Sequence, residues 1–185
     1  MSKVIGIAGR QGNCQEHQNI LDSLGFKNKI IVDRKDIKGL THLILPGGES
    51  TTQEMLWRQT GLWEEIKKFD NPVLGTCAGA IHIAKMKKKS ITCTRNAFGN
   101  QKESFYKEMD FHFENQKKTL KAMFIRAPKI NISDTKKVKI LASFTKKEND
   151  KKYTAVIRLD ERYWLSSCHP EAVGDSTLHE VFLKS

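Results

Sequence analysis

The fold is decided by residues 72–84, Pro72-Val73-Leu74-Gly75-Thr76-Cys77-Ala78-Gly79-Ala80-Ile81-His82-Ile83-Ala84. The short apolar run after the proline predicts a buried strand, and the apolar residues that follow predict a helix. Between them lies the pattern G-x-C-x-G, the thiol counterpart of the nucleophile elbow G-x-S-x-G. The central residue of such a turn is strained and its neighbours must lack bulk, which explains the glycines. The stretch therefore predicts an elbow that presents the Cys77 thiol at the carboxyl end of a strand.

The chain on either side of the elbow predicts more of the same architecture. Short apolar runs predict strands at residues 4–8, 29–32 and 42–45, and helical spacing predicts helices around 20–24 and over 50–66. The second half is richer in strands, predicted at 91–93, 111–113, 120–125, 140–144, 153–158 and 163–167, with a closing helix around 178–182. The alternation of strands and helices in the first half predicts an α/β fold of three layers, with a mostly parallel central sheet and flanking helices. No repeat or Pro/Gly/Ser linker divides the chain, so we expect a single domain over residues 1–185.

Composition excludes several classes of protein. The chain has 185 residues, 38% of them hydrophobic and 29% charged, which is typical of a globular protein with its own core. No apolar run approaches the roughly 18 residues of a membrane span, and the first residues are too short and glycine-broken for a signal peptide. The four cysteines form no CxxC pair, so we interpret them as free thiols. We expect a cytoplasmic protein, neither secreted nor bound to a membrane.

The net charge of +11 comes from 32 Lys and Arg against 21 Asp and Glu. Nucleic-acid readers tend to concentrate arginine and aromatic residues in one basic stripe. The lysines here are scattered in small clusters beside predicted turns and helix ends, where solvated lysines are ordinary. Positive charge alone gives only nonspecific, salt-sensitive attraction, so we do not expect a nucleic-acid partner. An acidic protein partner or phosphorylated metabolites remain compatible with this charge.

A second candidate for chemistry is His169-Pro170-Glu171, which follows the last predicted strand. A cysteine nucleophile needs a base, and the base needs a carboxylate that holds its tautomer. By itself the Cys77 pattern favours a buried structural cysteine in a Gly-rich turn, and His-Pro-Glu is also compatible with a surface turn. Together with the glycine loop described next, three separate strand ends supply a thiol, an imidazole–carboxylate pair and amide donors, and this coincidence favours catalysis.

The third candidate is Pro46-Gly47-Gly48-Glu49-Ser50, again at the end of a predicted strand. Consecutive glycines let the backbone approach a ligand and direct N–H groups at it, as an oxyanion hole requires. A phosphate-binding loop is the alternative, but the chain has neither G-x-G-x-x-G nor a GK[ST] ending. A plain helix-entry turn is the simplest interpretation of this loop alone.

The remaining histidines, His17, His42, His82, His112 and His179, lack a comparable setting and are interpreted as core or surface residues. Cys14 and His17 have C-x-x-H spacing, but two ligands without a second pair do not predict a zinc site.

Taken together, these motifs resemble those of the class I (triad) glutamine amidotransferases, and most closely the glutaminase subunits of pyridoxal 5'-phosphate synthase. The resemblance covers nearly the whole chain. Its motifs are Pro46-Gly47-Gly48-Glu49-Ser50-Thr51-Thr52, Gly75-Thr76-Cys77-Ala78-Gly79, Arg95-Asn96 with Phe98-Gly99, Glu103-Ser104-Phe105, Phe124-Ile125-Arg126-Ala127-Pro128 and His169-Pro170-Glu171.

The resemblance implies a role for each of several residues. Cys77 is the expected nucleophile, His169 the general acid and base, and Glu171 the residue that orients it. The remaining expected roles are glutamine binding by Gly48, Glu49, Ser50, Arg95, Ile125 and Arg126, and an oxyanion hole at Gly48 and Ala78.

The resemblance also implies the reaction and its partner. The chain is expected to hydrolyse L-glutamine to L-glutamate and ammonia through a cysteine thioester, without a metal or cofactor. The ammonia is expected to pass to a (β/α)8-barrel synthase subunit for vitamin B6 biosynthesis, in a large hetero-oligomer. Two alternatives stay open: a glutaminase for another acceptor pathway, and a catalytically silent regulatory scaffold.

Overall fold

The computed structural model describes residues 3–146 and 150–185. Its strands are β1 (Val4–Ala8), β2 (Lys27–Ile31), β3 (His42–Leu45), β4 (Val73–Thr76), β5 (Ile91–Thr94), β6 (Phe105–Phe113), β7 (Gln116–Phe124), β8 (Lys129–Ile132), β9 (Val138–Lys146), β10 (Lys151–Leu159) and β11 (Tyr163–Ser166). Its α-helices are α1 (Cys14–Ser23), α2 (Ser50–Gln59), α3 (Leu62–Lys68), α4 (Ala78–Met86) and α5 (Thr177–Phe182). Short 3-10 helices are η1 (Arg34–Ile37), η2 (Gln101–Glu103) and η3 (Glu171–Val173).

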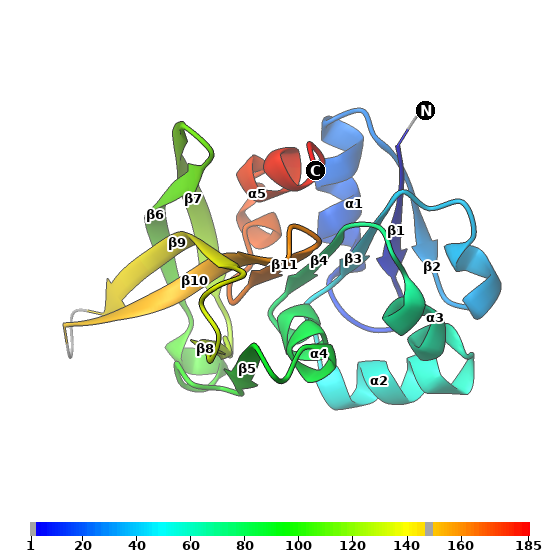
Figure 1. Cartoon of the computed structure of the whole chain (residues 1–185), viewed down its shortest axis with the longest axis horizontal. Coiled ribbons are helices and arrows are strands. Elements are labelled where there is room, and N and C mark those ends of the chain that lie inside the picture. Colours follow the sequence, from blue (N-terminus) through cyan, green and yellow to red (C-terminus); the bar gives the residue numbers. More distant parts are fainter. Residues whose placement is uncertain (1–2, 147–149) are drawn as a thin grey trace.

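Five strands form a parallel unit in the order β2-β1-β3-β4-β11 (Figure 1). The carboxyl ends of parallel strands meet at one edge of a sheet. The loops that follow Ala8, Leu45, Thr76 and Ser166 therefore gather at this edge. These loops contain all three motifs that the sequence singles out for chemistry.

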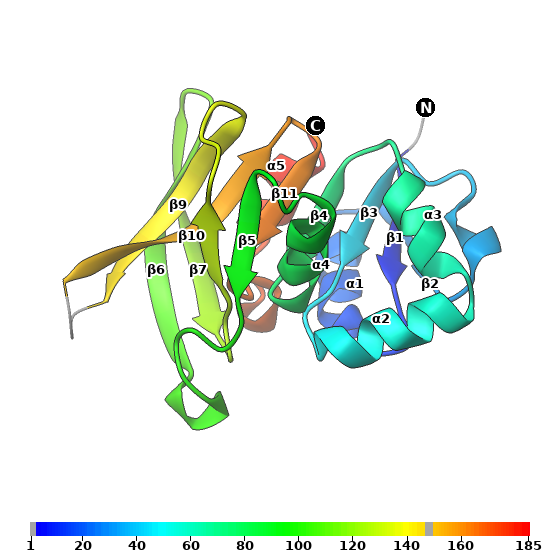
Figure 2. The same cartoon turned by 60° about the horizontal axis from the view of Figure 1, so that its bottom comes forward.

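Helices cover both faces of the parallel unit and give the three layers that the sequence predicts. Helices α2, α3 and α4 lie on one face and α1 lies on the other (Figure 2). Alternate side chains of a strand point to opposite faces, so each face has its own core. Ile5 and Ile7 of β1 pack in the cluster that holds Leu21 of α1, whereas Leu43 of β3 packs in the cluster that holds Trp57 of α2.

The other half of the sheet is antiparallel. Strands β10, β9, β6 and β7 continue from β11 in that order and complete nine strands. Aromatic side chains fill the space beside this extension, where Phe105 stacks on Phe124 at 4.7 Å between ring centroids. The predicted α/β fold is confirmed. Helices cover both faces of the parallel part of the sheet, and the antiparallel strands extend the sheet beyond it.

Some element boundaries differ from the sequence predictions. The single helix predicted over residues 50–66 is two helices, because Gly61 adopts a left-handed conformation with φ of 70° and ends the first one. Strand β8 was not predicted; it pairs with β5 in a separate two-stranded sheet. Strand β6 is much longer than the predicted 111–113. The prediction was too short because exposed side chains alternate with more buried ones along the first part of β6, so that part contains no apolar run.

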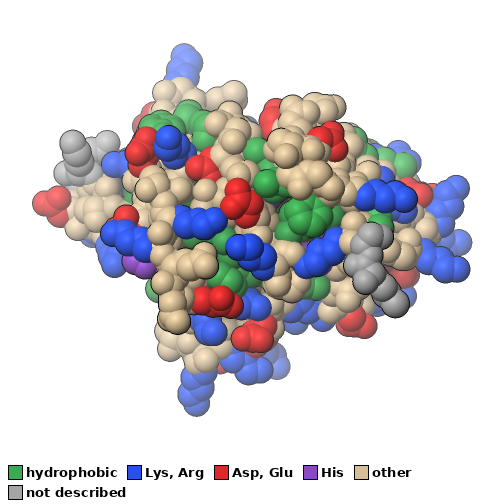
Figure 3. Space-filling model, turned by 90° about the horizontal axis from the view of Figure 1, so that it is seen from above, with side chains coloured by type: hydrophobic (Ala, Val, Ile, Leu, Met, Phe, Trp, Pro, Cys, Tyr) green, Lys and Arg blue, Asp and Glu red, His purple; other side chains and the backbone are tan. Residues whose placement is uncertain are grey.

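The surface shows no single basic stripe on the side seen in Figure 3. Lys and Arg side chains are separated there by uncharged surface and by Asp and Glu. No helix within residues 3–146 and 150–185 is long and apolar enough to cross a membrane. All four cysteines are free thiols, as predicted.

Candidate active site

The predicted elbow is present. Cys77 follows β4 and caps α4 with φ of 48° and ψ of −102°, a strained conformation for a residue with a side chain. A side chain on Gly79 would collide with the main chain of Leu45, and one on Gly75 would collide with the main chain of Gly79. Both glycines are therefore needed for α4 to start against β3 and β4. The thiol lies at the start of a helix, where the dipole favours negative charge.

The imidazole and carboxylate motif also forms as predicted. His169 Nδ1 lies 2.8 Å from Glu171 Oε1, across Pro170. The main chain of His169 is fixed by two hydrogen bonds with Met123, of 2.8 and 3.2 Å. Cys77 and His169 are each 6% exposed and Glu171 is 3% exposed, so all three are shielded from bulk water. Because Glu171 occupies Nδ1, Nε2 is the nitrogen left to exchange a proton with the thiol.

The electrostatics of this pair favour a charged imidazole. Burial by itself would lower the pKa of His169, but the Glu171 carboxylate and a hydrogen bond with Cys77 raise it well above its usual range. Burial would likewise raise the pKa of Glu171, but His17 and His169 hold it well below its usual range. The carboxylate therefore stabilises an imidazolium beside Cys77, as a cysteine nucleophile requires.

A buried network behind Glu171 holds its carboxylate in place. Oε1 accepts hydrogen bonds from Asn13 Nδ2 at 2.6 Å and from Thr76 Oγ1 at 3.3 Å. Thr76 Oγ1 lies 3.2 Å from His17 Nε2, and His17 Nδ1 lies 2.9 Å from His179 Nε2. Burial lowers the pKa of both histidines, that of His179 to about 3, so both rings are neutral at neutral pH.

The glycine loop after β3 and the start of α4 each supply an N–H group to the pocket that holds the thiol. The backbone N–H groups of Gly48 and Ala78 have no hydrogen-bond partner within the part of the chain that the structure describes. Both residues line the same pocket as Cys77. N–H donors without a protein partner, in the same pocket as a thiol, are what an oxyanion hole requires.

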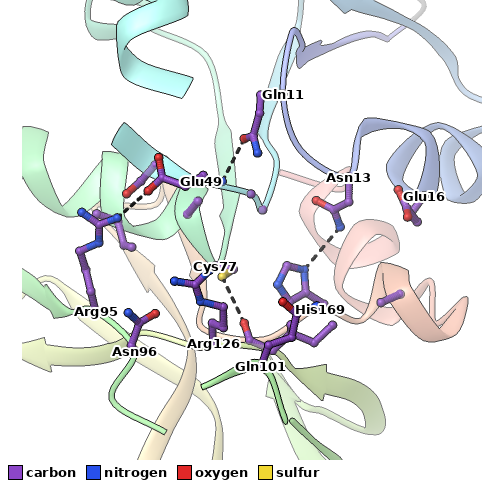
Figure 4. A pocket seen from close by; sticks show the side chains of 17 residues that line it. Gln11, Asn13, Glu16, Glu49, Cys77, Arg95, Asn96, Gln101, Arg126 and His169 are labelled. Carbon is purple, nitrogen blue, oxygen red and sulfur yellow. Dashed lines mark hydrogen bonds and ion pairs between the residues drawn. The ribbon is translucent and has the colours of Figure 1, made fainter. Parts of the chain in front are cut away.

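A pocket of about 360 Å³ opens at Cys77. Figure 4 shows the thiol at its centre, with Arg95 and Glu49 on one side and His169 on the other. Arg95 Nη2 lies 2.7 Å from Glu49 Oε1. Hydrogen bonds from the backbone and hydroxyl of Thr52 are the main reason that the pKa of Glu49 falls to about 2, so its carboxylate is charged at neutral pH. The pocket thus holds a half-exposed cation and a half-exposed anion side by side.

The structure brings nearly all predicted site residues together. The pocket is lined by Gly48, Glu49, Ser50, Cys77, Ala78, Arg95, Ile125, Arg126 and His169. Glu171 lies behind His169 and does not line it. The sequence did not single out Asn13, and it predicted His17 and His179 only as core or surface residues. No local pattern marks these residues, because their partners are distant in sequence.

No group of three or more His, Cys, Asp or Glu side chains arranged to hold a metal occurs within the described residues. Cys14 and His17, the C-x-x-H pair, are both buried in α1. His17 contacts Thr76 and His179.

Comparison with known proteins decides the family. The model of the SNO glutamine amidotransferase family matches residues 7–185. The chain belongs to that family. Pyridoxal 5'-phosphate synthase subunit PdxT of Methanococcus maripaludis is 34% identical over 192 residues, covering 99% of this chain and 97% of the relative. The protein of the same name from Thermosipho africanus is 32% identical, covering 97% and 96%.

Solved structures agree with this assignment. A crystal structure of a glutamine amidotransferase superposes with a TM-score of 0.84 and 33% identity, covering 97% of both chains. Another glutamine amidotransferase, from Thermotoga maritima, superposes with a TM-score of 0.61 at 16% identity, covering 99% of this chain and 83% of the other, which shows a shared fold. The chain is therefore a glutamine amidotransferase.

Proposed function

We propose that this amidotransferase is the glutaminase subunit of a pyridoxal 5'-phosphate synthase. It hydrolyses L-glutamine to L-glutamate and ammonia and supplies the ammonia to a synthase subunit. The observation that carries the chemistry is the Cys77 thiol in the pocket, with the buried His169–Glu171 pair beside it. The names of the relatives at 32–34% identity support the choice of acceptor.

The geometry supports a two-step reaction. The Cys77 thiolate attacks the side-chain amide carbon of glutamine, and the resulting oxyanion accepts hydrogen bonds from the N–H groups of Gly48 and Ala78. His169 donates its proton to the departing nitrogen, which leaves as ammonia, and a γ-glutamyl thioester remains. His169 then removes a proton from water, which attacks the thioester carbon; glutamate is released, and the departing Cys77 thiolate restores the starting pair with the His169 imidazolium. Glu171 stabilises the imidazolium in both steps.

Arg95 and Glu49 match the two charges of an amino acid substrate. Their side chains are half-exposed in the pocket and pair with each other at 2.7 Å. The α-carboxylate of glutamine would pair with the Arg95 guanidinium and the α-ammonium with the Glu49 carboxylate. Ser50, Ile125 and Arg126 line the same pocket and complete the proposed binding site.

Replacement of Arg95 tests this assignment. We expect Arg95→Gln to raise KM for glutamine by about 10- to 100-fold, the cost of a lost charge-assisted hydrogen bond. The effect on kcat should be smaller, because Arg95 contacts a part of the substrate that does not react. Steady-state kinetics measures both constants, and Arg34→Gln on η1 is the matched control. A fall in kcat at unchanged KM would contradict the assigned role.

We further propose that residues 1–185 act as a single glutamine amidotransferase domain that binds a (β/α)8-barrel synthase subunit in a large hetero-oligomer. The continuous nine-stranded sheet and the family match over residues 7–185 support one domain. The triad and free N–H groups argue against a silent scaffold, since a scaffold needs none of them.

The acceptor is tested by product formation. The chain is mixed with its cognate synthase subunit, the sugar phosphate substrates, and either glutamine or an ammonium salt. We expect pyridoxal phosphate from glutamine only when the chain is present, and from ammonium without it. If the chain releases glutamate but adds nothing to pyridoxal phosphate formation from glutamine, the amidotransferase serves another acceptor.

A further inference from the structure

A buried glutamine outside the triad holds the glycine loop in place. Gln53 lies on α2 and is fully buried. Its Nε2 amide lies 3.1 Å from the Gln11 carbonyl, 3.2 Å from the Pro46 carbonyl and 3.3 Å from the Gly47 carbonyl. Two N–H bonds are thus shared among three main-chain acceptors. They join the loop after β1 to the loop after β3, so one side chain sets the relative position of both.

The other end of this amide is held by His82 of α4. His82 Nε2 lies 3.1 Å from Gln53 Oε1. Since Gln53 Nε2 faces only carbonyls, the amide oxygen must accept, and His82 Nε2 must carry the proton. The ring packs against Trp57 and Trp63, with centroids at 4.8 and 5.3 Å. Burial lowers the pKa of His82 to about 4, so the ring is neutral at neutral pH.

These contacts determine which way the Gly47–Gly48 peptide faces. The Gly47 carbonyl accepts from Gln53 Nε2 and also from the Asn13 backbone N–H at 3.2 Å. In a trans peptide the C=O and N–H groups point in opposite directions. Two donors that hold the carbonyl on one side therefore direct the Gly48 N–H to the other side. That N–H has no protein partner within residues 3–146 and 150–185.

The packing around the loop restricts this peptide further. Gly12 has φ of 111°, and a side chain there would collide with the Gly47 carbonyl and come within 2.8 Å of Gln53 Nε2. A side chain on Gly48 would come within 2.9 Å of the same nitrogen. The glycines bring the two loops close enough for one amide to reach three carbonyls.

We propose that Gln53, anchored by His82, is a positioning residue for the oxyanion hole: it holds the Gly47 carbonyl so that the Gly48 N–H is available to the transition state. The proposal rests on the proposed glutaminase function, because only an acyl-transfer reaction develops an oxyanion at this point. Neither side chain lines the pocket that holds Cys77. In a purely structural role, Gln53 would only satisfy the hydrogen-bonding needs of buried carbonyls, and its replacement would change the stability of the fold but not kcat.

The two roles differ in what a substitution changes. Gln53→Met keeps the length and volume of the side chain and removes the donors. Removing an oxyanion-hole donor outright costs roughly 10²–10³-fold in kcat, so loss of a residue that only positions it should cost about 10- to 100-fold. KM for glutamine should change less than threefold, because the ground-state amide does not need the oxyanion hole. His82→Phe keeps the aromatic packing, leaves the Gln53 oxygen without its donor, and should lower kcat by a smaller factor.

The experiment compares these variants in the presence of the cognate synthase subunit. Gln59→Met, at the exposed end of the same helix, is the matched control. Three quantities are measured: kcat and KM for glutamine, the inhibition constant of a glutamine analogue with an aldehyde in place of the amide, and the rate of Cys77 alkylation by iodoacetamide. The aldehyde forms a tetrahedral adduct with an oxyanion, whereas alkylation by iodoacetamide does not.

The proposal predicts that Gln53→Met lowers kcat and weakens the aldehyde by similar factors while the alkylation rate stays near that of the parent enzyme. Equal kcat for Gln53→Met and Gln59→Met would overturn it, as would parallel loss of turnover and alkylation. If Gln53→Met does not fold, an unchanged kcat in His82→Phe overturns the proposal and a lowered kcat with normal alkylation supports it. Failure of the parent enzyme to release glutamate would instead overturn the glutaminase function.

Discussion

Cys77→Ala is expected to abolish glutamine hydrolysis, with a loss of kcat of roughly 10⁴- to 10⁶-fold, the range seen when a catalytic nucleophile is removed. The loss follows because no other thiol lines the pocket among the residues that the structure describes. Glutamate release in the presence of the synthase subunit measures it. Cys93→Ala is the matched control, because Cys93 is a nearby free thiol outside this pocket. Turnover that survives in Cys77→Ala would show that another group is the nucleophile.

Glu171→Gln is expected to lower kcat by roughly 10²- to 10⁴-fold, because the carboxylate fixes the His169 tautomer and stabilises the imidazolium. The glutamine amide can still reach Nδ1, but it carries no charge and presents either an oxygen or an NH₂ group. The buried His17 and Asn13, which share this carboxylate, lose their charged partner as well. Glu65→Gln on the surface of α3 is the control. Full activity in Glu171→Gln would contradict the role of this carboxylate.

Glu171→Gln should also shift the pH dependence of kcat/KM for glutamine toward lower pH. Burial lowers the pKa of His169, whereas Glu171 raises it. Without the carboxylate, the pKa of His169 falls, so the ring loses its proton at a lower pH than in the parent enzyme. The reactive form of a Cys–His pair is the thiolate with an imidazolium. The alkaline limb of kcat/KM should therefore move to lower pH in Glu171→Gln, and an alkaline limb that stays in place or moves upward would contradict this assignment.

The parallel half of the fold and the site could be predicted from sequence because local rules govern them. A glycine pattern between an apolar strand and a helix requires a sharp turn at Cys77, and the structure has it. His169 and Glu171 are two residues apart, so their contact follows from local geometry. The strand–helix alternation predicts parallel strands, and parallel strands bring the residues at their carboxyl ends to one edge of the sheet.

The support around the site could not be predicted in this way. Gln53 contacts residues from Gln11 to His82, and Thr76 contacts Glu171, 95 positions away. The hydrogen-bond partners of these buried amides and imidazoles come from other helices and strands. No fixed spacing in the sequence therefore marks such pairs. The antiparallel extension was also only partly predicted: β6 and β9 are half-exposed, and their polar alternation obscures their full length.

Covalent labelling of Cys77 by a glutamine-like chloroketone at neutral pH tests directly whether this thiol is the nucleophile. We expect one label per chain on Cys77, located by peptide mass spectrometry, with loss of glutaminase activity in proportion to labelling and protection by L-glutamine. Activity that is retained after Cys77 is fully labelled would contradict the role of Cys77 as the nucleophile. Inactivation that follows labelling of Cys14, Cys93 or Cys168 would contradict it equally.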